Sequence, residues 1–279
     1  MNKKNSGDRS PEQLREHYEI EKKLADKLKQ STKEERVSLY SSLYDELFKR
    51  VPHHPQLVRK NVSGKDEIVL GRRMQFLHKF LHANLNFVEV GAGDCSLSFA
   101  VARHVKNVYA VEVSSEITKD LVFPANCHLI ISDGSTIPLP PGSADLVYSN
   151  QLMEHIHPDD AYEQLTSIYT ILTTDGYYLC FTPNRLNGPH DISKYFDREA
   201  QGFHIKEYTN RELVAFFKAV GFRKIKAYVG VRGMYAVFPL SIIQLGERVL
   251  ESLPYSIQKT LARSLPFRFI LGIRIVAIK

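Results

Sequence analysis

The sequence predicts an α/β fold in which a mostly parallel sheet is covered by helices on both faces. Five short strands rich in Val, Ile, Leu, Tyr and Phe follow one another between residues 86 and 184. Helical stretches separate the first two strands and follow the fourth, an alternation typical of parallel sheets buried on both sides. The 279 residues are 43% hydrophobic and 24% charged, which provides enough apolar material for one large core.

Helices are expected before the first strand. Ser10-Pro11-Glu12 has the residues of a helix start: a capping serine, a proline in the first turn and an acid next to it. Ser31 or Thr32 opens a second helix, and the two prolines of VPHHPQ (51–56) end it. A third helix over 68–82 leads into the first strand.

The chain after the fifth strand combines a long polar loop with further helices and strands. A helix is expected over 210–220, ended by Gly221, and strands over 223–231 and 268–278. The apolar-rich segment between these strands predicts two short helices. We therefore expect a helical N-terminal extension at 1–66, a ligand-binding core at 67–235, and a helical insert with a final strand of the sheet at 236–279.

Composition argues against several classes of function and location. The net charge is +6, but Lys and Arg are spread along the chain without an Arg-rich tract, so we expect no nucleic-acid partner. The three cysteines lack CxxC spacing, which indicates neither a disulfide framework nor a zinc site. The N-terminus lacks the apolar core of a signal peptide and no apolar run reaches about 18 residues, so a cytoplasmic location is expected.

Polar residues and glycines follow four of the expected strands, at the point where each strand ends. Ligands of parallel sheets bind beyond the carboxyl ends of the strands, so these residues are the candidates for a binding site. They are Gly91 to Asp94, Glu112, Asp133 with Gly134, and Asn150 with Gln151.

The glycine turn narrows the class of ligand. A dinucleotide fingerprint would have a third glycine where Ser96 stands, and no phosphate-binding GxxxxGK[ST] motif is present. Glu112, 21 residues after Gly91, could accept hydrogen bonds from both hydroxyls of a ribose. Glu89 and Asp94 flank the turn, and a diphosphate about 5 Å from one such acid would lose roughly 3 kcal/mol at an effective dielectric constant near 20. The turn therefore favours a cationic nucleoside such as S-adenosylmethionine over a nicotinamide dinucleotide.

Four segments in order resemble the successive motifs of class I S-adenosylmethionine-dependent methyltransferases. They read VEVGAGDC, VYAVEVS, ISDGSTIPLPPGSADLVYSNQLMEHI and DGYYLCFTPN, and the resemblance covers about residues 70–235. It implies a Rossmann-like, seven-stranded mixed sheet whose final strand, within RFILGIRIVAIK, is antiparallel. It also implies that S-adenosylmethionine is the cofactor and that the 67–235 core binds it.

The resemblance assigns cofactor contacts to particular residues. It places Glu89, Gly91 and Gly93 near the methionine part, Glu112 at the ribose, Asp133 with Gly134 at the adenine, and Asn150 with Gln151 on the methionine side. One departure is Cys95, where many members of the family have a third glycine. A small side chain can be fitted there.

Histidines are the candidates for handling the acceptor. If the acceptor is a hydroxyl, a neutral histidine suits the role of general base near pH 7, and His190 and then His155 are the candidates. His204 and Tyr208 match a segment that precedes a helix in related methyltransferases, and they are candidate substrate contacts. The alternative interpretation is structural: His190 and His204 are buried, and Thr209 with Glu212 forms a capping box.

The segment EHIHPDD (154–160) raises the question of a metal. Ubiquinone-pathway O-methyltransferases, which bind a divalent metal, carry ExxEH here, and Glu154 and His155 match that motif. Gln151 replaces its first acid, which weakens a site for a hard cation, so we predict no metal. The segment equally reads as the start of a helix at Pro158.

We therefore predict a methyltransferase that acts on a small-molecule or glycan acceptor, with an oxygen acceptor favoured. A nicotinamide-dependent oxidoreductase and a cofactor-binding subunit without activity are the alternatives. Tyr40 and Tyr44 are expected to pack in the core rather than face the cofactor. The apolar residues of 236–264 are expected to pack on the sheet, and a lipid-like acceptor at a membrane or a second copy in a homodimer remains an alternative.

Overall fold

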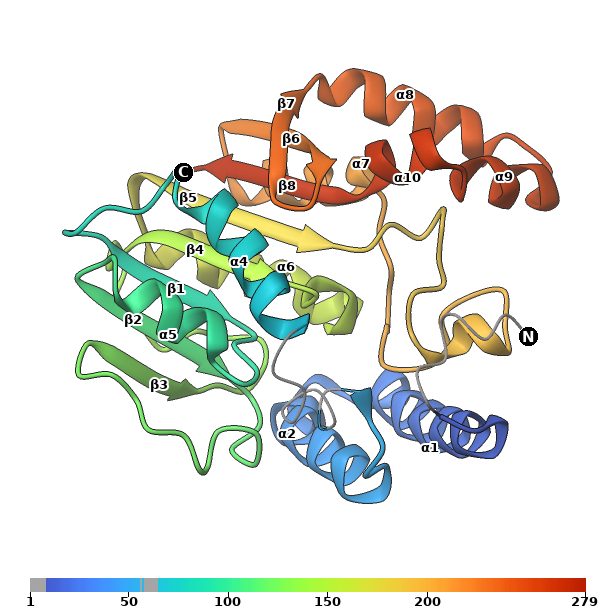
Figure 1. The fold of residues 1–279 in the computed structure, drawn as a ribbon, viewed down its shortest axis with the longest axis horizontal. Helices are drawn as coiled ribbons and strands as arrows, with labels where there is room; N and C mark the ends of the chain where they lie inside the picture. Colours follow the sequence, from blue (N-terminus) through green and yellow to red (C-terminus); the bar gives the residue numbers. More distant parts are fainter. Residues whose placement is uncertain (1–8, 56, 58–64) are drawn as a thin grey trace.

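The computed structural model describes residues 9–55, 57 and 65–279, so part of the expected 1–66 extension lies outside it. The described strands form one sheet of eight, in the order β3-β2-β1-β4-β5-β8-β6-β7 (Figure 1). Their bounds are β1 Asn86–Val90, β2 Asn107–Glu112, β3 Cys127–Ile131, β4 Ala144–Asn150, β5 Leu172–Thr182, β6 Lys224–Val231, β7 Met234–Phe238 and β8 Ile273–Ile278. The mostly parallel α/β fold is confirmed.

The first five strands of the chain, β1 to β5, run parallel, and β8 lies antiparallel between β5 and β6. The predicted antiparallel final strand is therefore present. The sheet has one strand more than the predicted seven, because β7 pairs with β6 at the edge. Arg232 and Gly233 both have positive φ (54° and 89°), and two such residues in succession make the tight turn of this hairpin.

The C-terminal segment differs from its predicted structure. It forms three helices, α8 Leu240–Glu251, α9 Tyr255–Ala262 and α10 Leu265–Leu271, where two were predicted. The strand predicted for 268–278 begins only at Ile273, because a proline in the first turn of α10 starts a helix that ends before Gly272. An apolar run alone did not distinguish helix from strand here.

Helices cover the two faces of the sheet. Residues that alternate along the strands point to opposite sides, so Phe87 and Leu146 pack with α4 (Lys65–Leu77) and α5 (Ser96–Ala102). Val88 and Val147 pack with α6 (Pro158–Ile171) and α7 (Asn210–Val220) on the other face. Thr209 caps α7 in a capping box with Glu212, and Gly221 ends that helix, as predicted.

The N-terminal helices lie beyond the carboxyl ends of β1 to β5, the side toward which these strands point in Figure 1. They are α1 (Pro11–Gln30), capped by Ser10, and α2 (Lys33–Arg50), capped by Thr32. A buried ion pair holds α2 on α6: the Arg36 guanidinium donates to both carboxylate oxygens of Asp160 (2.7 and 2.8 Å). The hydroxyl of Tyr40 donates to the same carboxylate (2.9 Å).

Within the described part of the chain, no helix combines the length and the apolar character that crossing a bilayer requires.

Candidate active site

A cavity with about 780 Å³ of free space, part of it open to solvent, lies beyond the carboxyl ends of the parallel strands. Its described wall comes from α2 (Tyr40, Tyr44, Phe48), the end of β1 (Val90, Gly91, Gly93), the end of β2 (Val111, Glu112, Val113, Ser114) with Ile117, the segment after β3 (Ser132, Gly134), the segment after β4 (Gln151, Leu152, His155, Ile156), and Gln164 of α6. The cavity therefore lies where a ligand of a parallel sheet is expected.

The turn after β1 presents backbone to the cavity. Gly91 and Gly93 have φ of 75° and 56°, a conformation that favours glycine. A Cβ built on Gly93 would meet no protein atom within 4 Å, so a side chain there would occupy free space of the cavity instead. Cys95, in the same turn, also has positive φ (57°), and its buried side chain is accommodated.

Glu112 is the one acid among the described lining residues. Its carboxylate accepts hydrogen bonds from the backbone N–H groups of Gly93 (2.7 Å), Val113 (2.9 Å) and Ser114 (3.1 Å). Burial raises the pKa of Glu112, and these three donors oppose the shift. The carboxylate is thus fixed at the junction between the glycine turn and the end of β2.

Another part of the wall is aromatic. Tyr44 and Phe48 of α2 line the cavity, and the ring of Tyr44 stacks on Phe203 with centroids 4.7 Å apart. The ring of Tyr40 packs against Gly134, where an added Cβ would come within 2.8 Å of it. Tyr40 is therefore both a packed residue and a lining residue, because α2 serves as core and as cavity wall.

His155 lies on the same wall, in the short helix η2 (Met153–His155) after β4. Its Nδ1 is 2.9 Å from the carbonyl oxygen of Phe203, and since a carbonyl can only accept, Nδ1 carries the proton. Burial, with a smaller effect of the neighbouring His204, lowers the pKa of His155 to about 3. The ring is neutral near pH 7, with the lone pair on Nε2.

Comparisons with known proteins indicate the family of the domain that contains this cavity. Residues 88–180, from β1 into β5, match the family model described as "Methyltransferase domain". No curated protein matches the sequence. The chain carries a class I S-adenosylmethionine-dependent methyltransferase domain.

Solved structures share this fold at low sequence identity. Phosphoethanolamine N-methyltransferase 1 of Haemonchus contortus, in complex with phosphoethanolamine and S-adenosylhomocysteine, superposes with a TM-score of 0.59 at 15% identity, over 89% of this chain and 50% of that one. An S-adenosylmethionine-dependent methyltransferase of Archaeoglobus fulgidus gives 0.52 at 18% identity, over 76% and 94%. A complex of the Haloferax volcanii Trm112 methyltransferase activator with a putative methyltransferase gives 0.52 at 13% identity, over 77% and 90%.

S-adenosylmethionine is the methyl donor of this methyltransferase, and the cavity fits it. The glycine turn leaves room for close approach of the donor, and Glu112 offers carboxylate oxygens where a ribose is expected. Gly91, Gly93, Glu112, Gly134 and Gln151 all line the cavity. The nicotinamide-dependent oxidoreductase considered from the sequence is not the family that matches.

Three residues expected at the donor lie outside the described cavity wall. Glu89 is buried beneath the turn, where the hydroxyl of Ser98 donates to it (2.6 Å), and burial raises its pKa to about 7. The Asp133 carboxylate accepts from the backbone N–H groups of Ser135 and Thr136 in its own loop. Asn150 ends β4 without lining the cavity. The cavity is therefore less acidic than the sequence suggests.

His204 adjoins His155 away from the cavity and is surrounded by carboxylates. Its ring meets that of His155 edge to face (4.9 Å), and its Nδ1 donates to Glu207 (2.7 Å). Burial would lower the pKa of His204, but the hydrogen bond to Glu207 and the charges of Glu154 and Asp191 outweigh it and raise the pKa to about 9. His204 is therefore a buried cation at pH 7.

Two of the predicted residues have structural partners instead. His190 lies outside the described wall of the cavity, and its Nε2 contacts the carbonyl oxygen of Asn184 (3.1 Å) and Oδ1 of Asn187 (2.8 Å). Tyr208 is fully buried in the core beside α7. Neither contributes to the described wall.

Two groups of side chains have ligand atoms close enough to hold a metal ion: Glu154, His155 and His204, and His17, Glu21 and His54. In the first group Oε1 of Glu154 is buried and, among the described residues, has no hydrogen-bond partner. The proton on His204 already supplies positive charge beside it, and a metal would have to displace that proton. The absence of a metal therefore stays a prediction.

Proposed function

We propose that this methyltransferase transfers the methyl group of S-adenosylmethionine to a small-molecule or glycan acceptor, with a hydroxyl favoured as the accepting group. One observation carries the proposal: a single cavity is lined by the glycine turn and Glu112 and also by neutral His155 with Tyr44 and Phe48. A donor and an acceptor in this cavity would lie side by side.

The proposed role of His155 is to contact the acceptor. Bound S-adenosylmethionine supplies a methyl group already activated by its sulfonium, so the protein mainly has to position the acceptor. With Nδ1 donating to Phe203, Nε2 can accept a hydrogen bond from a hydroxyl. The low pKa of His155 makes it a weak proton acceptor, so orientation of the hydroxyl is its larger contribution.

The lining indicates the chemistry of the acceptor. The Haemonchus enzyme is in complex with phosphoethanolamine. A phosphate is typically bound by the charge-assisted hydrogen bonds of Arg or Lys side chains. Among the residues described as lining this cavity there is no Lys or Arg, while aromatic and aliphatic side chains are frequent. We therefore favour an acceptor with an apolar or aromatic part and without a phosphate. Nucleic acid is not proposed as a partner.

The test combines donor binding with turnover. We expect S-adenosylhomocysteine to bind in isothermal titration, and Glu112→Gln to weaken that binding about 10- to 100-fold, because a charge-assisted hydrogen bond is lost. Glu116→Gln is the matched control, since Glu116 is exposed and pairs only with Lys119 (2.8 Å) among the ion pairs described. Binding of NADH in place of S-adenosylhomocysteine would contradict the assignment of the cavity.

Acceptors are then screened as phenols, sugar hydroxyls and amines in a methyl-transfer assay. With an accepted hydroxyl compound, His155→Asn should lower turnover while donor affinity is retained. Unchanged turnover of this variant would remove His155 from the proposed function.

A further inference from the structure

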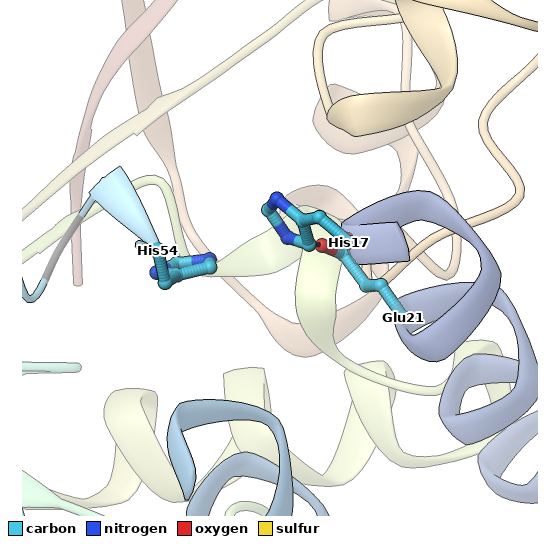
Figure 2. A group of neighbouring side chains, drawn as sticks. All are labelled: His17, Glu21 and His54. Carbon is cyan, nitrogen blue, oxygen red and sulfur yellow. Dashed lines mark hydrogen bonds and ion pairs between the residues drawn. The ribbon is translucent and has the colours of Figure 1, made fainter. Parts of the chain in front are cut away.

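Two buried side chains of α1, those of His17 and Glu21, form a hydrogen-bonded pair. His17 and Glu21 are 3% and 5% exposed, and Nε2 of His17 lies 2.6 Å from Oε2 of Glu21. Figure 2 shows both side chains extending from α1 toward His54. A buried carboxylate needs hydrogen-bond partners for both of its oxygens. The partner of the second oxygen, Oε1, therefore shows what else Glu21 holds in place.

The direction of the first hydrogen bond follows from Arg9. The Arg9 guanidinium lies 3.0 Å from Nδ1 of His17 and can only donate, so Nδ1 accepts and Nε2 carries the proton given to Glu21. This arrangement leaves no lone pair on Nε2 for a cation between His17, Glu21 and His54. The pair is therefore a hydrogen-bonded unit and not the start of a metal site.

The second carboxylate oxygen of Glu21 is hydrogen-bonded to a residue that also contacts the cavity wall. The backbone N–H of Phe203 donates to Oε1 of Glu21 (2.8 Å), and the carbonyl of the same residue accepts from Nδ1 of His155 (2.9 Å). One residue thus connects the pair on α1 with the ring that lines the cavity. Its own ring stacks on Tyr44, which lines the cavity too.

We propose that His17 and Glu21 are positioning residues that fix the orientation and tautomer of His155 through the backbone of Phe203. Three hydrogen bonds of 2.6 to 2.9 Å, all between buried or half-buried groups, link α1 to the cavity wall. The N-terminal extension is then part of the acceptor site rather than only a cover over it. The role given to His155 rests on the proposed function.

Other hydrogen bonds also hold the loop between β5 and α7 (183–209), but they involve residues other than Phe203. Asp191 accepts from the backbone N–H of Gly202 (2.9 Å), and Tyr18 of α1 donates to Asp197. Within the described hydrogen bonds, Glu21 alone accepts from the N–H of Phe203. We expect removal of Glu21 to loosen the backbone at Phe203, and with it the position of the carbonyl, while the loop stays attached.

The test reads the tautomer of His155 directly, by nitrogen NMR of the full chain labelled at its histidine rings and saturated with S-adenosylhomocysteine. The signal of His155 is identified by its loss in His155→Asn. We expect a single Nδ1–H tautomer in the unsubstituted protein and an average of two tautomers in Glu21→Ala. Glu21→Gln retains an oxygen for the Phe203 N–H, so it should keep the single tautomer.

Glu19→Ala is the matched control, because Glu19 is also a glutamate of α1 but is exposed and pairs with Arg15 (3.6 Å) instead of Phe203. It should leave the His155 signal unchanged. If Glu21→Ala does not fold, the tautomer of His155 is measured in His17→Phe instead. This variant removes the hydrogen bond from His17 to Glu21 and keeps an aromatic ring at the position. An unchanged single tautomer in folded Glu21→Ala, or in folded His17→Phe in its absence, overturns the proposal.

Turnover separates this proposal from the proposed function. With an accepted hydroxyl compound, Glu21→Ala should lower kcat about 10- to 100-fold through misplacement of the acceptor, and it should add little when His155→Asn is already present. If His155→Asn itself has no effect on turnover, the proposed function fails, whereas the tautomer still decides on the positioning.

Discussion

His204 is a cation held among Glu154, Glu207 and Asp191, and its raised pKa links the stability of the protein to pH. The pKa of His204 is about 9 in the folded chain and near 6.5 in the unfolded chain. The stabilisation is therefore fully present below pH 6.5 and is lost as the pH rises through 9. We expect the free energy of unfolding to fall by about 3 kcal/mol across this interval.

Urea denaturation at pH 6, 7.5 and 9 measures this effect. His204→Gln should remove most of the slope, while His128→Gln, at an exposed position of β3, should keep it. A slope that survives in His204→Gln would show that another group carries the pH dependence.

The same proton argues against a metal at Glu154, His155 and His204. Because a divalent cation would have to displace the proton of His204, we expect no bound metal after purification and unchanged turnover in the presence of a chelator. Elemental analysis checks the first point. A stoichiometric metal that disappears in His204→Gln would contradict the prediction.

At this scale the sequence predicted the donor side of the site better than the acceptor side. Gly91, Gly93 and Glu112 line the cavity because short strand–turn segments fix where such residues lie. The hydrogen-bond partner of His155 is Phe203 in a long loop, and the backbone of Phe203 in turn contacts Glu21 of a separate helix. No local pattern encodes such a meeting, so the sequence does not show that His155, and not His190, lines the cavity.

At the scale of elements, a buried ion pair fixes α2, which forms one wall of the cavity, on α6. Arg36 and Asp160 are 3% and 2% exposed, and their bidentate contact is joined by Tyr40. We expect Arg36→Ala to lower the free energy of unfolding by about 3 to 5 kcal/mol, because Asp160 is left buried without its cation. The affinity for S-adenosylhomocysteine should fall as well, since Tyr40 and Tyr44 lose their fixed place.

The two helices offer a matched control. Lys33 and Glu163 form an exposed ion pair between α2 and α6 (2.8 Å), and Lys33→Ala should cost at most about 1 kcal/mol. Calorimetry and titration with S-adenosylhomocysteine compare the two variants. Equal effects on stability would show that α2 is held by its apolar contacts and not by the buried ion pair.

Helices that begin with a capping box were predicted well, whereas the elements of the C-terminal segment were predicted less well. Ser10, Thr32 and Thr209 each form a capping box with the residue three positions on, a local signal that sequence shows directly. The start of β8 depends on pairing with the distant strand β5, and the presence of β7 depends on its hairpin with β6. The apolar residues of that segment suit either helix or strand, and only the sheet decides between them.

At the scale of the whole molecule, Glu247 of α8 joins the C-terminal helices to the methyltransferase core. It is fully buried, and its carboxylate accepts from the side chains of Asn184 (2.7 Å) and Asn210 (2.9 Å) and from the backbone N–H groups of Asn210 (2.8 Å) and Arg211 (3.0 Å). These donors belong to the segment after β5 and to α7. One side chain of α8 thus satisfies groups from two segments of the core.

We expect Glu247→Ala to lower the free energy of unfolding by about 3 to 5 kcal/mol, because buried donors lose their acceptor. Glu251, one turn further along α8, pairs with Arg185 and Arg211 near the surface, so Glu251→Ala should cost about 1 kcal/mol or less. Urea unfolding followed by fluorescence and by circular dichroism measures both variants. If the junction makes the chain one cooperative unit, the two signals coincide in the unsubstituted protein and separate in Glu247→Ala, where the C-terminal helices unfold first. Coincident curves with a small loss of stability in Glu247→Ala would mean that packing of the helices, and not this carboxylate, unites the molecule.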